Sequence, residues 1–172
     1  DVNYMGVVRC TKAVLPRMRK QRSGHIIAVT SVGGLVGQPF NEFYCAAKFA
    51  VEGYFESLAT YVSPNFGIDF TCVEPGGIRT EFANSVLKQI GATGGMLEDE
   101  YLPILQDYIA SAQNRQGTDG GYQTADQVAA VVMRTLHSDE PPIRVRTSDW
   151  AEELTRLKTG LDPNGKELKA LV

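Results

Sequence analysis

The sequence predicts an α/β fold in which helices cover both faces of a doubly wound parallel sheet. Helical and strand-like segments alternate along the chain, which is typical of βαβ crossovers. Two of the strand-like segments, "HIIAVTS" and "IDFTCVE", are nearly continuous apolar and β-branched runs. Runs of this kind are expected for parallel strands that are buried on both faces. Three strands are expected in this sequence.

The first half of the chain is expected to contain two helices and two strands. A helix over residues 3–20 ends at the breaker "RSG", and a strand at 25–31 follows it. A loop of small residues then leads to a second helix over residues 41–59, and the second strand, 68–74, stops at "PGG". One face of the second helix is expected to pack in the core, because apolar residues recur there with helical spacing: Phe43, Ala47, Ala50, Tyr54 and Leu58.

The second half begins with a polar, helical insertion over residues 80–115, which "GATGG" interrupts and the loop "GTDGGY" ends. Thr124 is expected to be the N-cap of the next helix, because a threonine hydroxyl there can accept a free backbone N–H. The sequence "PIRVRTS" predicts the third strand, and residues 149–172 predict a charged helical tail. Residues 1–172 are expected to form a single domain.

The composition excludes several classes of function. With 172 residues, 43% of them hydrophobic, the chain can bury one ordinary core. The formal net charge is −3 and the basic residues are scattered, so nucleic-acid binding is not expected. The one basic cluster, residues 17–22, is interpreted as a solvated helix end. No apolar run has the length of a membrane span, and none is expected.

The cysteines and histidines predict neither a disulfide framework nor a metal site. Cys10, Cys45 and Cys72 are odd in number and lack metal-ligand spacing, so reduced thiols in a cytoplasmic protein are expected. His25 and His137 are far apart in the sequence and have no accompanying ligand.

Tyr44 and Lys48 are the residues of the second helix that core packing does not explain. Four residues apart, they lie one turn from each other on the same face. A free tyrosine has a pKa near 10, so proton exchange near neutrality requires a shift of about three units, or roughly 4 kcal/mol. A cation about 4 Å away, at an effective dielectric of about 20, supplies about 4 kcal/mol. The charge of Lys48 is therefore large enough to supply the pKa shift that Tyr44 needs.

Further residues are expected to meet this pair at the carboxyl edge of the sheet, where open α/β folds bind their ligands. Ser31 ends the first strand, and "PGGIRT" closes the second. We expect Ser31 to bind a substrate oxygen against the phenol, although a serine in this place can also be an ordinary strand-end hydroxyl. The Tyr-x-x-x-Lys spacing has low specificity when it stands alone.

The combined pattern resembles the short-chain dehydrogenase/reductase family. In that family a strand-end serine precedes a Tyr-x-x-x-Lys motif and a Pro-Gly turn with a threonine downstream. Here Ser31 lies 13 residues before Tyr44, and "PGGIRT" matches the turn. Asn3, in "VNYMG", lies 28 residues before Ser31, where the family carries a fourth catalytic residue. The resemblance covers at least residues 2–82 and implies a partial Rossmann-like sheet.

The resemblance assigns roles to individual residues. Tyr44 would be the general acid/base, and Lys48 would tune it and bind the nicotinamide ribose. Ser31 would position the substrate oxygen, and Asn3 would hold a water that links Lys48 to solvent. The remaining residues would contact the nicotinamide end of the cofactor: Pro75 and Gly76 through a close backbone, Ile78 through its main chain and Thr80 through its hydroxyl. Residues 80–123 would form a substrate lid.

Segments such as "FNEFYCAAKFAVEGYFESLA" resemble the retinol and estradiol-type steroid dehydrogenase branch. That branch implies a lipophilic alcohol or carbonyl substrate and NADP in preference to NAD. The family's Gly-rich pyrophosphate turn is not found in the sequence, so the chain is expected to be the catalytic part of a longer enzyme and to leave one sheet edge exposed.

The alternative is a catalytically silent dimerisation module of the same fold. In either case the resemblance implies a homodimer or homotetramer, built from the helix at residues 5–18 and the helix at residues 44–62. Small residues of the second helix would let a partner helix approach closely: Ala46, Ala47, Ala50 and Gly53. The same residues could instead pack only against the chain's own sheet.

Overall fold

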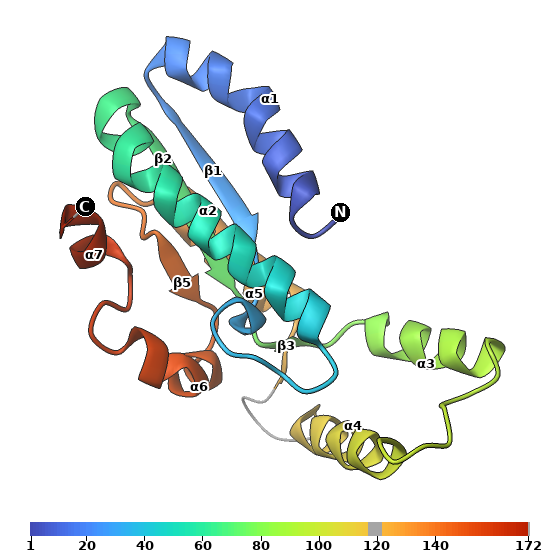
Figure 1. Ribbon diagram of the computed structural model, residues 1–172. Helices are drawn as coiled ribbons and strands as arrows, with labels where there is room; N and C mark the ends of the chain where they lie inside the picture. The colour runs from blue at the N-terminus through green and yellow to red at the C-terminus, as the bar shows by residue number, and fades with distance from the viewer. Residues whose placement is uncertain (117–121, 172) are drawn as a thin grey trace.

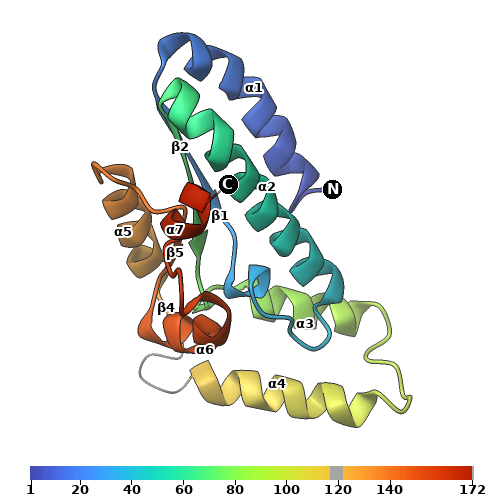
Figure 2. The ribbon, with the colours of Figure 1, turned by 60° about the vertical axis from the view of Figure 1, so that its left-hand side comes forward.

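The computed structural model describes residues 1–116 and 122–171 and has the predicted α/β architecture (Figure 1). Three parallel strands form the main sheet in the order β1-β2-β5: β1 (Gly24–Val29), β2 (Ile68–Glu74) and β5 (Arg144–Arg146). Two helices, α1 (Met5–Gln21) and α2 (Glu42–Phe66), lie on one face of the sheet, and α5 (Ala125–Leu136) lies on the other (Figure 2). The predicted doubly wound sheet of three strands is therefore confirmed.

The register of the strands brings their carboxyl ends together. Gly24 lies opposite Ile68 at the start of β1, and Val29 lies opposite Val73 at its end. The backbone pairing continues beyond β1, because the N–H of Thr30 donates to the carbonyl of Val73 at 2.7 Å. The residues that follow β1 and β2 therefore emerge side by side at one edge of the sheet. On its other side β1 pairs with no strand among the residues that the structure describes, so the expected open edge is present.

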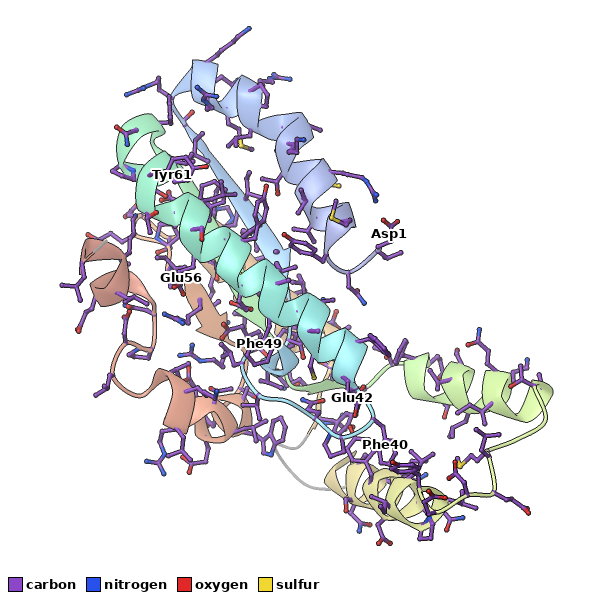
Figure 3. The ribbon with its side chains drawn as sticks, in the orientation of Figure 1. Asp1, Phe40, Glu42, Phe49, Glu56 and Tyr61 are labelled. Carbon is purple, nitrogen blue, oxygen red and sulfur yellow. The ribbon has the colours of Figure 1, made fainter. Side chains whose placement is uncertain are left out.

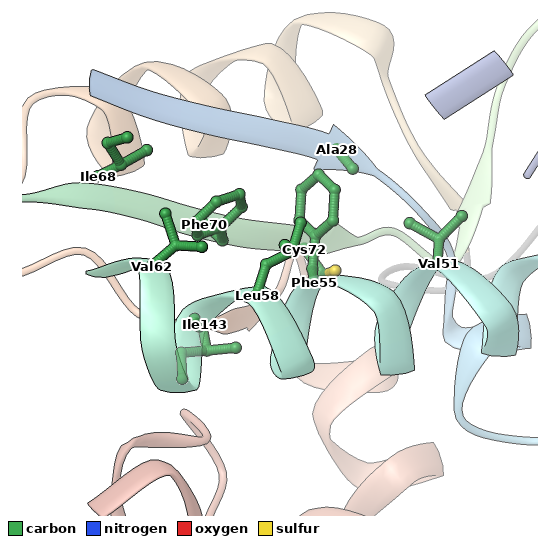
Figure 4. Close-up of a cluster of buried hydrophobic side chains, with 10 residues drawn as sticks. Ala28, Val51, Phe55, Leu58, Val62, Ile68, Phe70, Cys72 and Ile143 are labelled. Carbon is green, nitrogen blue, oxygen red and sulfur yellow. The ribbon is translucent and has the colours of Figure 1, made fainter. Parts of the chain in front are cut away.

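The hydrophobic core lies between α2 and the sheet (Figure 4). The Phe55 and Phe70 rings meet edge to face with centroids 5.6 Å apart, an arrangement that aromatic pairs favour. Gly67 ends α2 with a φ of 64°, and a Cβ there would lie 2.8 Å from the Arg22 carbonyl oxygen. Only glycine fits both the backbone conformation and this close approach, so the turn from α2 into β2 depends on it.

The core face of α2 differs from the predicted one. Phe43 was expected in the core and is 93% exposed, while Ala47 and Ala50 are only partly buried. The buried residues of α2 that form the core cluster lie further along the helix: Val51, Phe55, Leu58, Ala59 and Val62. The prediction was wrong for Phe43, because the first turns of α2 extend beyond the carboxyl edge of the sheet and have no strand beneath them.

Most of the remaining elements lie around that edge, but the last helix packs against α2 instead. The remaining elements are η1 (Val32–Gly34), β3 (Gly77–Ile78), α3 (Phe82–Ala92), α4 (Leu102–Gln116), β4 (Tyr122–Gln123), α6 (Asp149–Thr159) and α7 (Lys166–Leu171). The two helices α3 and α4 come from the predicted insertion and lie beyond the carboxyl ends of the strands (Figure 1). Thr124 caps α5 in a capping box with Gln127, as expected. Residues 117–121 of the predicted loop "GTDGGY" lie outside the described residues.

A second, two-stranded sheet was not predicted. β3 and β4 pair in parallel, with Gly77 opposite Tyr122 and Ile78 opposite Gln123. The sequence predicts a loop before Thr124, because strands of two residues have no detectable periodicity. Along the described residues, no helix combines the length and the apolar character needed to cross a bilayer.

Candidate active site

A cavity of about 840 Å³ lies at the carboxyl edge of the sheet, where the loops after β1 and β2 meet the start of α2. Seven of the eight site residues named from the sequence line it: Ser31, Tyr44, Lys48, Pro75, Gly76, Ile78 and Thr80. Asn3 is exposed in the turn before α1 and does not line the cavity. The role of Asn3 stays a prediction.

Tyr44 and Lys48 project from the first two turns of α2. The Lys48 Nζ lies 5.6 Å from the centroid of the Tyr44 ring and donates a hydrogen bond to the Val29 carbonyl oxygen at 3.1 Å. Burial lowers the pKa of Lys48, and the nearby Glu52 carboxyl opposes part of that effect. The helix thus places a cation next to a phenol, as the spacing of four predicts.

Ser31 and Tyr44 both lie against Gly33. A Cβ on Gly33 would lie 3.1 Å from Tyr44 Cε1 and 3.3 Å from Ser31 Oγ, so both side chains converge on the space that this glycine leaves free. The Gly33 N–H donates to Ser31 Oγ at 3.0 Å and fixes the position of the hydroxyl. The Ser31 proton therefore remains available for a ligand in the cavity.

The turn after β2, residues 75–77, lines the cavity. Its carbonyl at Pro75 accepts from the Val32 N–H at 3.0 Å, which ties it to the loop after β1. A Cβ on Gly76 would lie 2.7 Å from the Trp150 ring, and one on Gly77 would lie 2.7 Å from the Tyr122 ring. These glycines let two aromatic side chains pack directly on the main chain, so the turn, Trp150 and Tyr122 together form one wall of the cavity.

Sequence reasoning missed the aromatic and aliphatic walls of the cavity. These come from the insertion and the tail: Phe82, Tyr108, Ala112, Tyr122, Trp150 and Leu154. The Asn41 side-chain amide donates to the Tyr108 hydroxyl at 3.0 Å and to the Pro39 carbonyl at 2.8 Å, so it connects α4 to the start of α2. No local pattern marks these residues, because they meet only after α4 and α6 have packed around the edge of the sheet.

A buried acidic pair, also missed, lies beneath the cavity. Glu74, the last residue of β2, is 0% exposed, and its Oε2 lies 3.3 Å from Nη1 of Arg146. Burial and the neighbouring Glu52 raise the pKa of Glu74 to about 9, although Arg146 acts in the opposite direction. Burial also raises the pKa of Glu52. Two adjacent buried carboxyls resist ionising together, which is the direction in which Glu52 moves the pKa of Glu74.

Comparison with known proteins identifies relatives. The family model described as short chain dehydrogenase matches residues 1–91. The chain is 41% identical to retinol dehydrogenase 8 from Bos taurus over 166 residues, which are 96% of this chain and 52% of that protein. It is 36% identical to 17-beta-hydroxysteroid dehydrogenase type 1 from Homo sapiens over 166 residues, or 96% of this chain and 49% of that protein.

A solved structure shows the same fold. The crystal structure of a short-chain dehydrogenase from Streptomyces avermitilis superposes with a TM-score of 0.67 at 25% identity, over 98% of this chain and 57% of that chain. The chain spans about half the length of the curated relatives that it matches.

Proposed function

The chain belongs to the short-chain dehydrogenase family, and we propose that it is the catalytic part of an NAD(P)-dependent oxidoreductase. The reaction is the interconversion of an alcohol and its ketone or aldehyde. The observation that carries the proposal is the convergence of Ser31, Tyr44 and Lys48 on one cavity. Proton transfer requires the phenol to lie within hydrogen-bond reach of the substrate oxygen, and a shared cavity allows this.

The residues at the turn after β2 fit the nicotinamide end of a dinucleotide. Gly76 and Gly77 line the same cavity as Thr80, which carries a hydroxyl, and Lys48, which carries an ammonium group. When bound, a nicotinamide ring supplies hydride transfer to or from the substrate carbon. We assign the contacts of that ring and its ribose to Lys48, Pro75, Gly76, Ile78 and Thr80.

The chain's own residues transfer the proton of the substrate hydroxyl. In alcohol oxidation the ionised Tyr44 oxygen takes the hydroxyl proton of the substrate, and in carbonyl reduction the Tyr44 hydroxyl returns it. Ser31 donates a hydrogen bond to the same substrate oxygen and holds it against the phenol. The Lys48 ammonium stabilises negative charge on the phenol oxygen. We assign to Asn3 the role of binding a water molecule near Lys48.

We assign a lipophilic substrate, of retinoid or steroid type, to this cavity. Phe82, Tyr108, Trp150 and Leu154 supply walls that an apolar ligand fills, and the polar groups of Ser31 and Tyr44 fix its orientation. Residues 80–123 would act as the substrate lid. The names of two relatives, a retinol dehydrogenase and a hydroxysteroid dehydrogenase, agree with this choice. NADP is the assigned cofactor, in preference to NAD.

We assign a homodimeric or homotetrameric state to the protein, with α1 and α2 at the interface. The outward face of α2 carries exposed small and aromatic residues, among them Ala46, Phe49, Gly53 and Tyr61; Figure 3 labels Phe49 and Tyr61 on this helix. A second helix can approach such a face closely. We place the protein in the cytoplasm, since Cys10, Cys45 and Cys72 are free thiols.

Turnover of a substrate panel by the natural, full-length protein tests the proposal. Retinol and estradiol are compared with ethanol and glycerol, with NADP or NAD as oxidant, by the fluorescence of the reduced nicotinamide. We expect kcat/KM to be highest for the lipophilic alcohols with NADP. Absence of turnover with every alcohol, and with the corresponding carbonyls in the reverse direction, contradicts the proposal and favours a silent dimerisation module.

A further inference from the structure

Three consecutive residues at the end of β1 are each held by a different group. The Val29 carbonyl accepts a hydrogen bond from Lys48, and Ser31 accepts one from the backbone of Gly33. Between them, the buried Thr30 hydroxyl donates to Glu52 Oε1 at 2.5 Å. The same hydroxyl lies 3.2 Å from the Val73 carbonyl oxygen, but its single proton favours the closer acceptor.

Glu52 also lies directly beneath the loop that follows Ser31. A Cβ on Gly34 would lie 3.0 Å from Glu52 Cγ, 3.1 Å from Glu52 Oε1 and 3.2 Å from the Lys48 carbonyl oxygen. The η1 turn that Ser31 caps therefore rests on the Glu52 side chain. Lys48 and Glu52 lie one turn apart on the same face of α2. Lys48 therefore binds Val29, and Glu52, on the next turn, binds Thr30.

The neighbours of Glu52 include both donors and another carboxyl. Glu74 and Cys72 approach it from β2 and Arg144 from β5. Glu74 Oε1 is buried and has no partner among the described residues as long as both carboxyls are ionised. A proton on Glu74 resolves this, since the protonated carboxyl then donates to Glu52. Glu52 thus accepts from Thr30, and if the Thr30 hydroxyl turns to the Val73 carbonyl instead, Glu52 Oε1 loses this donor.

We propose that Glu52 is a positioning residue of the active site, which holds Thr30 and the loop above it so that the Ser31 hydroxyl faces Tyr44. The inference rests on the proposed function and assigns no contact with substrate to Glu52. Without the Thr30–Glu52 bond, Lys48 still ties α2 to Val29, but Thr30 and the loop after it lose their hydrogen bond to α2 and can shift. A displacement of about 1 Å between reacting groups lowers turnover by up to about 100-fold.

The test compares variants of the natural, full-length protein. Thr30→Val and Glu52→Ala each remove one partner of the bond, and the double variant removes both. Thr30→Ser and Glu52→Gln preserve the donor and the acceptor. Thr11→Val is the matched control, because Thr11 is a buried threonine of α1 that does not line the cavity. The measurements are kcat and hydrogen exchange of the peptide that contains residues 30–36.

We expect Thr30→Val and Glu52→Ala to lower kcat by about 10- to 100-fold. The double variant should fall no further than the worse single variant, because both changes break the same bond. Thr30→Ser and Glu52→Gln should recover most of the loss, and Thr11→Val should leave kcat unchanged. Exchange of residues 30–36 should rise in both disruptive variants.

Two results overturn the inference: additive losses in the double variant, or kcat and exchange in Thr30→Val and Glu52→Ala that match those of the Thr11→Val control. Failure of the proposed function gives a different result. The unmodified protein would then turn over no alcohol or carbonyl, while the exchange of residues 30–36 would still report whether Glu52 holds the loop.

Discussion

Replacement of Glu74 by glutamine should remove a large pH dependence from the stability of the protein. Glu74 is fully buried, and its pKa rises from the reference value of 4.5 to about 9. The folded state therefore binds a proton that the unfolded state has released between these two values. Under that condition the free energy of unfolding falls as the pH rises, by up to about 1.4 kcal/mol per pH unit.

Glutamine reproduces the protonated form of Glu74. Its amide can donate to Glu52 and its carbonyl can accept from Arg146, but it does not titrate. The free energy of unfolding of Glu74→Gln should therefore fall less steeply with pH than that of the unmodified protein. The other titratable groups should contribute equally to the two slopes of unfolding free energy against pH. The difference between the slopes therefore reports the proton that the acidic pair holds.

Urea unfolding at several pH values between about 5.5 and 8.5 measures both slopes. Glu100→Gln is the control, since Glu100 is an exposed carboxyl outside the cavity. Its slope should follow that of the unmodified protein. Parallel slopes for Glu74→Gln and the unmodified protein would refute the reasoning, because Arg146 would then hold Glu74 ionised throughout this range.

Three further predictions concern the cavity and the assembly. Lys48→Met should lower turnover strongly and move the remaining activity to higher pH, because a neighbouring cation favours the ionised phenol; a pH profile of kcat with an unchanged optimum would contradict this. Gly76→Ala should lower kcat/KM for a lipophilic alcohol, since the new methyl group would lie 2.7 Å from the Trp150 ring and push it into the cavity; kinetics equal to those of the unmodified enzyme would show that Trp150 moves aside freely. In sedimentation the protein should be at least dimeric and Ala46→Glu should dissociate it; a monomer at high concentration would contradict the assigned interface.

Local sequence patterns predicted much of the fold. The strand at residues 68–74 was predicted with the bounds that β2 has, because a β-branched run between Gly67 and Pro75 leaves little ambiguity. The Thr124 cap was predicted because the interaction spans only three residues. The core position of Phe43 was predicted wrongly, because helical periodicity does not reveal where the underlying sheet ends.

The candidate site was predicted only in part. Ser31, Tyr44 and Lys48 could be named because they lie at fixed distances in the sequence and at one sheet edge. Trp150 could not, since its place in the cavity depends on how α6 packs. Glu52 likewise is an ordinary polar residue of α2 in the sequence, and only the fold places it against Thr30.

Turnover by the Tyr44→Phe variant tests the proposed chemistry most directly. The measurement is kcat of the natural, full-length protein for a lipophilic alcohol with NADP, with Tyr61→Phe on the outer face of the same helix as control. Loss of the Tyr44 hydroxyl should lower kcat by about 100- to 10,000-fold, as expected for a general acid/base, while the thermal midpoint stays near that of Tyr61→Phe. A Tyr44→Phe enzyme that retains more than about a tenth of the normal turnover would contradict the proton-transfer role of Tyr44.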